Sequence, residues 1–193
     1  MTLSDVPAHR TPITVIERFA TLRAMRRSQL ADAFTHHVWA TMRILDTCAA
    51  LSAEQLATIV PSTDRSILDT ARHFVGGDAL YLLWLTDDRT FAIDTDAMDL
   101  TALRSAMARH AIGWSTLLAL DLDTDTVVKD IDDHGYERDA PVGVRLAQAL
   151  HHGTDHRSQI STALTLLGVE PPAIDVWDYG IDSGRLTDTP PPS

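Results

Sequence analysis

Apolar residues recur every three to four positions in four long stretches of the chain, over about 28–51, 65–85, 100–120 and 143–167. This spacing places them on one face of an α-helix. The apolar face of the last stretch is formed by Val142, Leu146, Ala149, Ile160, Ala163 and Leu167. Four amphipathic helices of this length predict an all-α protein built as a four-helix bundle.

Two shorter elements are predicted beside the four helices. The pattern over Thr14–Met25 is that of a short amphipathic helix separate from the one that follows it. His134-Gly135 lies between two short runs, 126–128 and 136–138, that favour strands. This arrangement predicts a small β-hairpin before the last helix.

The two ends of the chain differ in character from the bundle. Trp177 and Tyr179 are too apolar for a free tail, so the segment that holds them is predicted to pack back across the bundle. We therefore expect an N-terminal extension over 1–27, a bundle domain over 28–180 and a flexible C-terminal tail over 181–193.

The last helix carries two histidines toward its apolar face. His152 and His156 are four residues apart, so their imidazoles lie one turn above the other. A third histidine, His73, lies on the predicted apolar face of the second helix, one turn before Gly77. A buried imidazole needs a partner, which is either a hydrogen-bonding group or a metal ion. Three protein ligands with a fourth position open are typical of catalytic zinc sites, and we expect a metal centre here.

Composition and charge narrow the function classes. The formal charge is −11 over 193 residues, and nucleic acid is an unexpected partner because a phosphate-binding face needs a basic surplus. No apolar run reaches membrane-spanning length, and the first residues lack the pattern of a signal peptide. The single cysteine, Cys48, fits a reducing cytosol and is expected in the core. These features predict a cytoplasmic protein that acts on a small molecule.

Three segments of the chain resemble the DinB/YfiT-like superfamily: 37–46 (HVWATMRILD), 66–73 (SILDTARH) and 152–160 (HGTDHRSQI). The superfamily usually shows a histidine, three residues and then His-Arg-Gly-Gln, and Ser158 stands here in place of that glycine. Thr41 stands where an asparagine is frequent. The resemblance implies a metal-binding four-helix bundle, often a homodimer, with His73, His152 and His156 as the metal ligands.

The resemblance also implies a class of chemistry. Members of the superfamily include thiol-dependent S-transferases and isomerases that use mycothiol or bacillithiol. We expect a divalent metal, with zinc first and nickel or iron as alternatives, because imidazole suits all of them. A low-molecular-weight thiol is the expected co-substrate. A hydrolase that lowers the pKa of a metal-bound water, and a metal-binding stress protein without activity, remain alternatives.

Several further residues are candidates for the pocket or for support of the ligands. The candidates are His37, Trp39, Thr41, Gly77, Trp84 and Arg157. Gly77 allows either a close helix crossing or the approach of a ligand. Arg157 is expected to pair with a carboxylate in the bundle. The free N–H of a ligand histidine is expected to bond an aspartate, for which the candidates are Asp69, Asp78 and Asp155. Packing in the core is the alternative role for two tryptophans, Trp84 and Trp177. His110 is expected to be structural or on the surface.

Overall fold

The computed structural model describes residues 15–131 and 135–191, with side chains described from residue 30 onward. Its helices and strands are α1 (Val15–Cys48), α2 (Ala53–Leu56), α3 (Ile67–Thr86), the 3₁₀ helix η1 (Arg89–Phe91), α4 (Leu100–Ala119), β1 (Val127–Ile131), β2 (Glu137–Pro141), α5 (Val142–Leu166) and α6 (Val176–Asp182).

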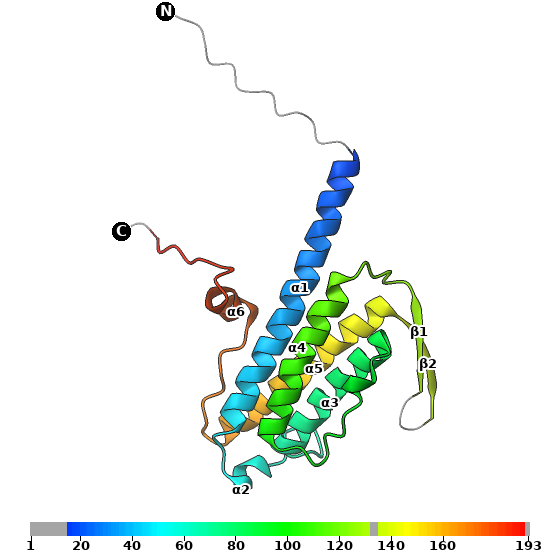
Figure 1. The fold of residues 1–193 in the computed structure, drawn as a ribbon. Coiled ribbons are helices and arrows are strands. Elements are labelled where there is room, and N and C mark those ends of the chain that lie inside the picture. Colours follow the sequence, from blue (N-terminus) through cyan, green and yellow to red (C-terminus); the bar gives the residue numbers. More distant parts are fainter. Residues whose placement is uncertain (1–14, 132–134, 192–193) are drawn as a thin grey trace, which may run out of the picture.

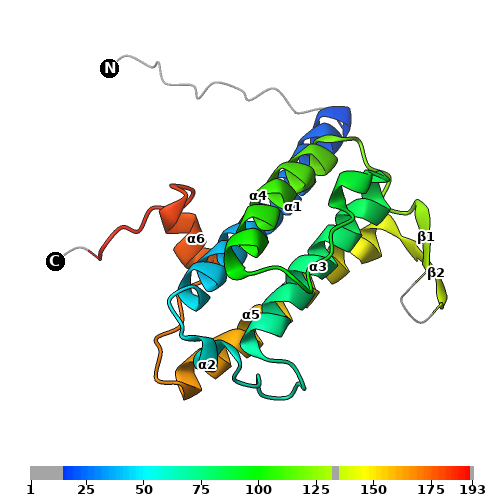
Figure 2. The same ribbon diagram turned by 60° about the horizontal axis from the view of Figure 1, so that its bottom comes forward.

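The four long helices α1, α3, α4 and α5 form a bundle (Figures 1 and 2). In this bundle α1 packs against α4 and α5, and α3 packs against the same two helices. The predicted all-α bundle with a hairpin before the last long helix is therefore confirmed. Each of the three later helices begins and ends within about two residues of its predicted bounds.

The strands of the hairpin are longer than predicted. Strands β1 and β2 are antiparallel and pair Val127 with Pro141 and Ile131 with Glu137, so both strands extend beyond the predicted runs. Gly135 has a φ of +82°, in the left-handed region that a glycine adopts without strain. The other residue of the predicted turn, His134, lies outside the described residues.

Helix α1 is one continuous helix of 34 residues, and the predicted division into two helices is wrong. The sequence between the two predicted helices explains why the helix continues. Arg26 and Arg27 are good helix formers, and neither glycine nor proline occurs between Met25 and Ser28.

The apolar core has two connected parts. One is built around Ile44, Phe74, Met107 and Ile160, and the other around Phe34, Leu82, Trp114 and Leu146. On α3 the buried positions are Ile67, Thr70, Ala71, Phe74, Val75, Asp78, Ala79 and Leu82. Leu80 lies outside this buried face, and its side chain is 39% exposed.

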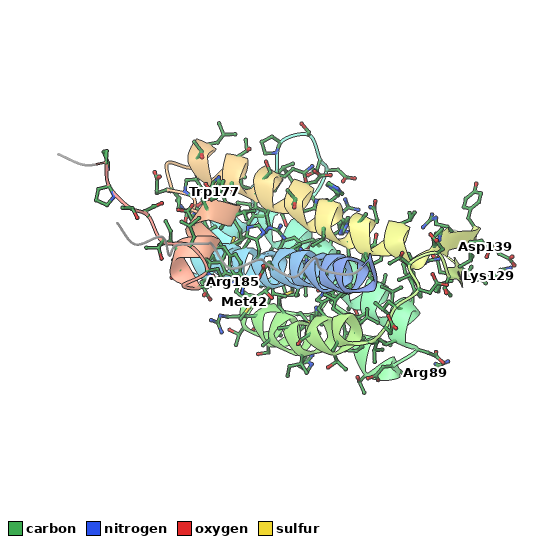
Figure 3. The ribbon with its side chains drawn as sticks, turned by 90° about the horizontal axis from the view of Figure 1, so that it is seen from above. Met42, Arg89, Lys129, Asp139, Trp177 and Arg185 are labelled. Atoms are coloured by element: carbon green, nitrogen blue, oxygen red, sulfur yellow. The ribbon has the colours of Figure 1, made fainter. Side chains whose placement is uncertain are left out.

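The segment after α5 packs on α1 through α6, with Tyr179 buried. The Trp39 indole donates a hydrogen bond of 2.7 Å to Asp182, and Arg185 pairs with Asp32 at 2.6 Å. The expectation that Trp177 is packed is wrong, because its side chain is 70% exposed and projects from α6 (Figure 3). Within a helix this short, only one side faces α1, and Tyr179 occupies it.

None of the described helices combines the length and hydropathy that crossing a membrane requires.

The packing of α4 predicts a contrast between two of its apolar residues. Replacing the fully buried Leu103 by alanine is expected to lower the free energy of unfolding by about 2–5 kcal/mol. The same change at Ile112, which is 69% exposed, is expected to alter it by less than about 0.5 kcal/mol. Urea denaturation of both variants measures the difference, and equal losses would contradict the assigned helix face.

Candidate metal centre

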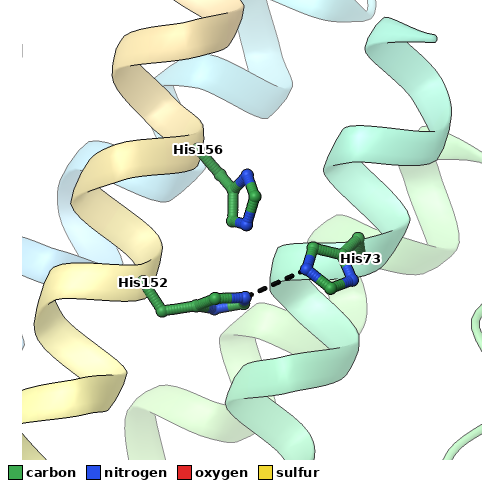
Figure 4. Close-up of side chains that lie close together, drawn as sticks. All are labelled: His73, His152 and His156. Carbon is green, nitrogen blue, oxygen red and sulfur yellow. Dashed lines mark hydrogen bonds between the residues drawn. The ribbon is translucent and has the colours of Figure 1, made fainter. Parts of the chain in front are cut away.

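Three histidines from two helices meet at one place in the bundle (Figure 4). His73 comes from α3, and His152 and His156 come from α5. Their ring centroids are 4.5–4.9 Å apart, and one nitrogen of each ring lies within 4.8 Å of the other two. The Nε2 atoms of His73 and His152 are 3.1 Å apart. The three residues predicted as a triad are therefore brought together.

Gly77 creates the space that one of these rings occupies. A Cβ atom built on Gly77 would lie 2.6 Å from Cε1 and 3.1 Å from Nδ1 of His152. No real side chain fits at that distance unless the ring moves. The group that approaches Gly77 is therefore a side chain of the facing helix α5, the imidazole of His152.

The environment of His73 and His152 favours neutral imidazoles. Burial lowers the pKa of His73 from 6.5 to about 4, with further contributions from the charges of Arg65 and His156. Burial also lowers the pKa of His152 to about 4, together with the two neighbouring histidines. Because a histidine binds a metal in its neutral form, these two rings can coordinate a metal ion at neutral pH.

The ring of His156 is oriented by a residue that the sequence analysis missed. Its Nδ1 lies 2.8 Å from Oε1 of Gln159, three residues later on α5. An amide oxygen accepts only, so Nδ1 carries the proton and Nε2 is left with a lone pair. The spacing of three residues is itself a signal that these side chains can meet on a helix.

None of the three candidate aspartates accepts the free N–H of a ligand histidine in the described contacts. Asp69 pairs with Ser66 and Arg72, and Asp78 accepts hydrogen bonds from His37 and Trp114. Asp155 is exposed.

The donor set fits a divalent metal ion such as zinc. Two nitrogens bound tetrahedrally at about 2.0–2.1 Å from one ion lie about 3.3 Å apart. The 3.1 Å between His73 and His152 is close to this value, and His156 is within reach. No aspartate, glutamate or cysteine belongs to this cluster among the described residues, so all three ligands are uncharged.

A buried polar network lies directly behind the triad. The carboxylate of Asp78 on α3 accepts hydrogen bonds of 2.9 Å from His37 Nε2 on α1 and from Trp114 Nε1 on α4. His110 Nδ1, also on α4, is 3.2 Å away without the alignment of a hydrogen bond. Burial alone would raise the pKa of Asp78, but the interactions of its carboxylate with His37 and His110 outweigh burial and lower it. His110 is therefore a structural residue, which is one of the two roles predicted for it.

Arg157 joins the last helix to this network. Its guanidinium donates to His37 Nδ1 at 3.0 Å and to Thr41 Oγ1 at 3.1 Å, and burial lowers its pKa to about 10. The predicted direct pairing of Arg157 with a carboxylate is wrong, because His37 stands between Arg157 and Asp78. Thr41 thus supplies an acceptor oxygen to Arg157.

His37 therefore faces the inside of the bundle. Its side chain is 2% exposed and both ring nitrogens have partners inside the bundle, so of its candidate roles the structure leaves support of the helices rather than lining of the groove. Since Nδ1 accepts from Arg157, the proton of His37 is on Nε2 and points at Asp78. A Cβ on Gly153 would collide with Cε1 of His37, which explains a glycine beside His152.

The two remaining candidates lie away from the three rings. Trp39 is held by Asp182 and lines an apolar groove between α1 and α4. Trp84 lines a pocket between α3, α5 and β2, where Arg145 lies over its ring at 5.4 Å.

An open groove of about 700 Å³ gives access to the triad on the side of His73. Its charged residues are Arg65, Asp69, Arg72, Asp94 and Asp96. A small molecule entering this groove would reach the imidazole of His73 first.

The class that these features define is a four-helix bundle whose facing helices bring together three imidazoles that could hold a metal ion. Comparison with family models identifies it further: the model of the DinB family matches residues 25–183, and the chain belongs to this family. Comparison with curated proteins gives no match.

Solved structures support the fold. The chain resembles a DinB-like protein from Bacillus cereus ATCC 10987, with a TM-score of 0.56 and 17% sequence identity over 76% of this chain and 95% of that chain.

The two adjacent glycines of α3 provide a matched test of the site. In Gly77→Ala the new methyl group must displace the His152 ring, and we expect the affinity for zinc to fall by about tenfold or more. In Gly76→Ala the methyl group meets only the side chain of Thr95, and the affinity should be unchanged. Competition titration with a chromophoric chelator measures both. Equal affinities would refute the role assigned to Gly77.

The lowered pKa values of His73 and His152 predict how the metal-free protein responds to acid. Between pH 6.5 and about 4 the unfolded chain binds protons that the folded rings resist, so stability falls as the pH falls. The loss begins near pH 6.5 and levels off below about 4. Denaturation midpoints of wild type and His152→Gln should show a weaker pH dependence in the variant over this window, and identical slopes would contradict the assignment.

Proposed function

We propose that this DinB family protein is a metal-dependent thiol S-transferase. The observation that carries the proposal is the cluster of three imidazoles, which is open to a groove and includes no carboxylate from the described residues. When bound there, a divalent ion with neutral ligands keeps its full charge and supplies a Lewis acid that lowers the pKa of a thiol in the open position.

The residues of the chain have separate tasks in this proposal. His73, His152 and His156 hold the ion, and Gln159 keeps Nε2 of His156 free for it. Arg65 contributes positive charge near His73, which favours the neutral form of that imidazole. In the reaction the thiol loses its proton to solvent, sulfur forms a bond to an electrophilic carbon, and the leaving group departs with its electron pair.

The thiol has to come from outside the protein. Cys48 is the single cysteine of the chain, its side chain is fully buried, and burial raises the pKa of its thiol to about 12. A thiol in this environment is neither accessible nor ionised at neutral pH. A low-molecular-weight thiol such as mycothiol or bacillithiol is the proposed co-substrate.

Hydrolysis is the second candidate and is less well supported. A hydrolase of this kind needs a base close to the attacking water, and no carboxylate belongs to the cluster in the described part of the chain. The expected homodimer stays a prediction.

A turnover assay separates these functions. With 1-chloro-2,4-dinitrobenzene as electrophile, we expect chloride release only when both zinc and a low-molecular-weight thiol are present. His156→Ala should lower the rate by at least about 100-fold, because a ligand is lost. The exposed neighbour His151 on the same helix provides the matched control, and His151→Ala should keep the activity.

Two outcomes would contradict the proposal. Turnover of ester substrates without thiol would favour the hydrolase. Stoichiometric metal without turnover of either kind would favour a metal-binding protein that is no enzyme.

A further inference from the structure

The imidazole of His152 lies between two aromatic residues of α3. Gly77 comes four residues after His73 and four before Tyr81, so these three positions follow one another on one face of the helix. The ring of His152 lies over Gly77. Its centroid is 4.9 Å from the ring of His73 and 6.2 Å from the ring of Tyr81, and both pairs meet edge to face. Helix α3 therefore contacts this imidazole at three successive turns.

His152 lacks the hydrogen bond that usually orients a metal-binding imidazole. In most such sites the second ring nitrogen donates to a carboxylate, a carbonyl or a water. His156 follows this pattern through Gln159. Nδ1 of His152 has no hydrogen-bond partner among the residues that the structure describes, and it faces Gly77, where a Cβ would lie 3.1 Å away. The described contacts that can orient this ring are therefore packing contacts.

The position of Tyr81 is the one that limits movement of this ring. Nε2 of His152 lies 3.1 Å from Nε2 of His73 (Figure 4). A rotation that carries the ring away from His73 along α3 brings it against Tyr81, which lies on the far side of Gly77. The ring of Tyr81 thus opposes the movement that would take Nε2 out of reach of the other two histidines.

Tyr81 is itself fixed by two contacts. Its hydroxyl and the side-chain amide of Gln148 are joined by a hydrogen bond, and Gln148 lies about one turn before His152 on α5. The ring of Trp84 lies 5.6 Å from the ring of Tyr81. Separations of this size are typical of aromatic pairs in contact. Tyr81 is therefore attached to the same part of α5 that carries the ligand.

We propose that Tyr81 is a positioning residue of the metal centre, whose ring keeps Nε2 of His152 within reach of the other two ligands. In this role it contacts neither metal nor substrate and acts only through His152. The inference rests on the metal-binding part of the proposed function and is independent of thiol transfer.

Zinc titration of Tyr81 variants on the full chain tests this role. Tyr81→Ala removes the ring, and we expect the affinity for zinc to fall by about tenfold or more. Tyr81→Phe keeps the ring beside His152 and loses only a hydrogen bond, so its affinity should stay within about threefold of the wild type. Tyr81→Leu fills more of the space than alanine and is the second ring-free variant if Tyr81→Ala does not fold. It should weaken zinc binding more than Tyr81→Phe does.

Tyr179→Ala provides the matched control. This tyrosine is buried on α6, and its ring contacts His36 and Trp39 on α1 instead of a ligand. Its removal costs packing without touching the metal centre, so the affinity for zinc should equal that of the wild type.

Cobalt in place of zinc reports the coordination itself, because its visible absorption depends on the geometry of the ligands. Four-coordinate cobalt absorbs far more strongly than six-coordinate cobalt. We expect weaker absorption per bound cobalt in Tyr81→Ala, since a loosely held His152 admits solvent to the ion. Tyr81→Phe and Tyr179→Ala should match the wild type. A loss of stability alone leaves this spectrum unchanged.

A folded Tyr81→Ala protein with wild-type zinc affinity and cobalt spectrum would overturn the inference. An equal loss of affinity in Tyr81→Phe or Tyr179→Ala would also overturn it, because the ring of Tyr81 would then not be the cause. The predicted differences in metal binding without thiol turnover would refute the proposed function and leave the inference standing. Thiol turnover with equal metal binding in all variants would do the reverse, and a wild type that binds no zinc would refute both.

Discussion

One buried carboxylate connects all four helices of the bundle. Asp78 on α3 receives hydrogen bonds from His37 on α1 and from Trp114 on α4, and His37 in turn receives one from Arg157 on α5. A charge in an apolar core is costly unless it is paired and fully hydrogen-bonded. The helices must therefore keep the one arrangement in which these groups meet. Apolar packing alone tolerates small shifts along a helix more readily than such a network does.

The metal centre depends on this arrangement because its residues are neighbours of the network. Asp78 follows Gly77, which makes room for the ring of His152, and Arg157 follows the ligand His156. When the network sets the relative positions of α3 and α5, it also sets the distance between His73 and the pair on α5. The same two helices extend to the pocket at Arg138 and Arg145. The network thus sets the positions of the three histidines and of this pocket together.

The sequence predicted the parts of the fold that depend on local spacing. Periodicity within each helix located the long helices, and the convergence of His73 with His152 and His156 followed from their faces and from the resemblance to relatives. The network around Asp78 was missed because its partners come from three other helices, and spacing within one helix does not show which polar groups meet across a core. A local sign was available, since Asp78 lies four residues after Phe74 and four before Leu82 on the buried face. The exposure of Trp177 depends on how α6 docks on α1, which its composition does not reveal.

The central claim is that the three imidazoles bind one metal ion, and metal analysis of the purified protein tests it most directly. Protein prepared without chelators is analysed by mass spectrometry of its elements, as wild type and as His156→Ala, with folding of both checked by circular dichroism. We expect close to one divalent metal ion per chain in the wild type and little in the variant. A folded wild type without metal that also fails to take up added zinc would contradict the claim and leave the three histidines as structural residues.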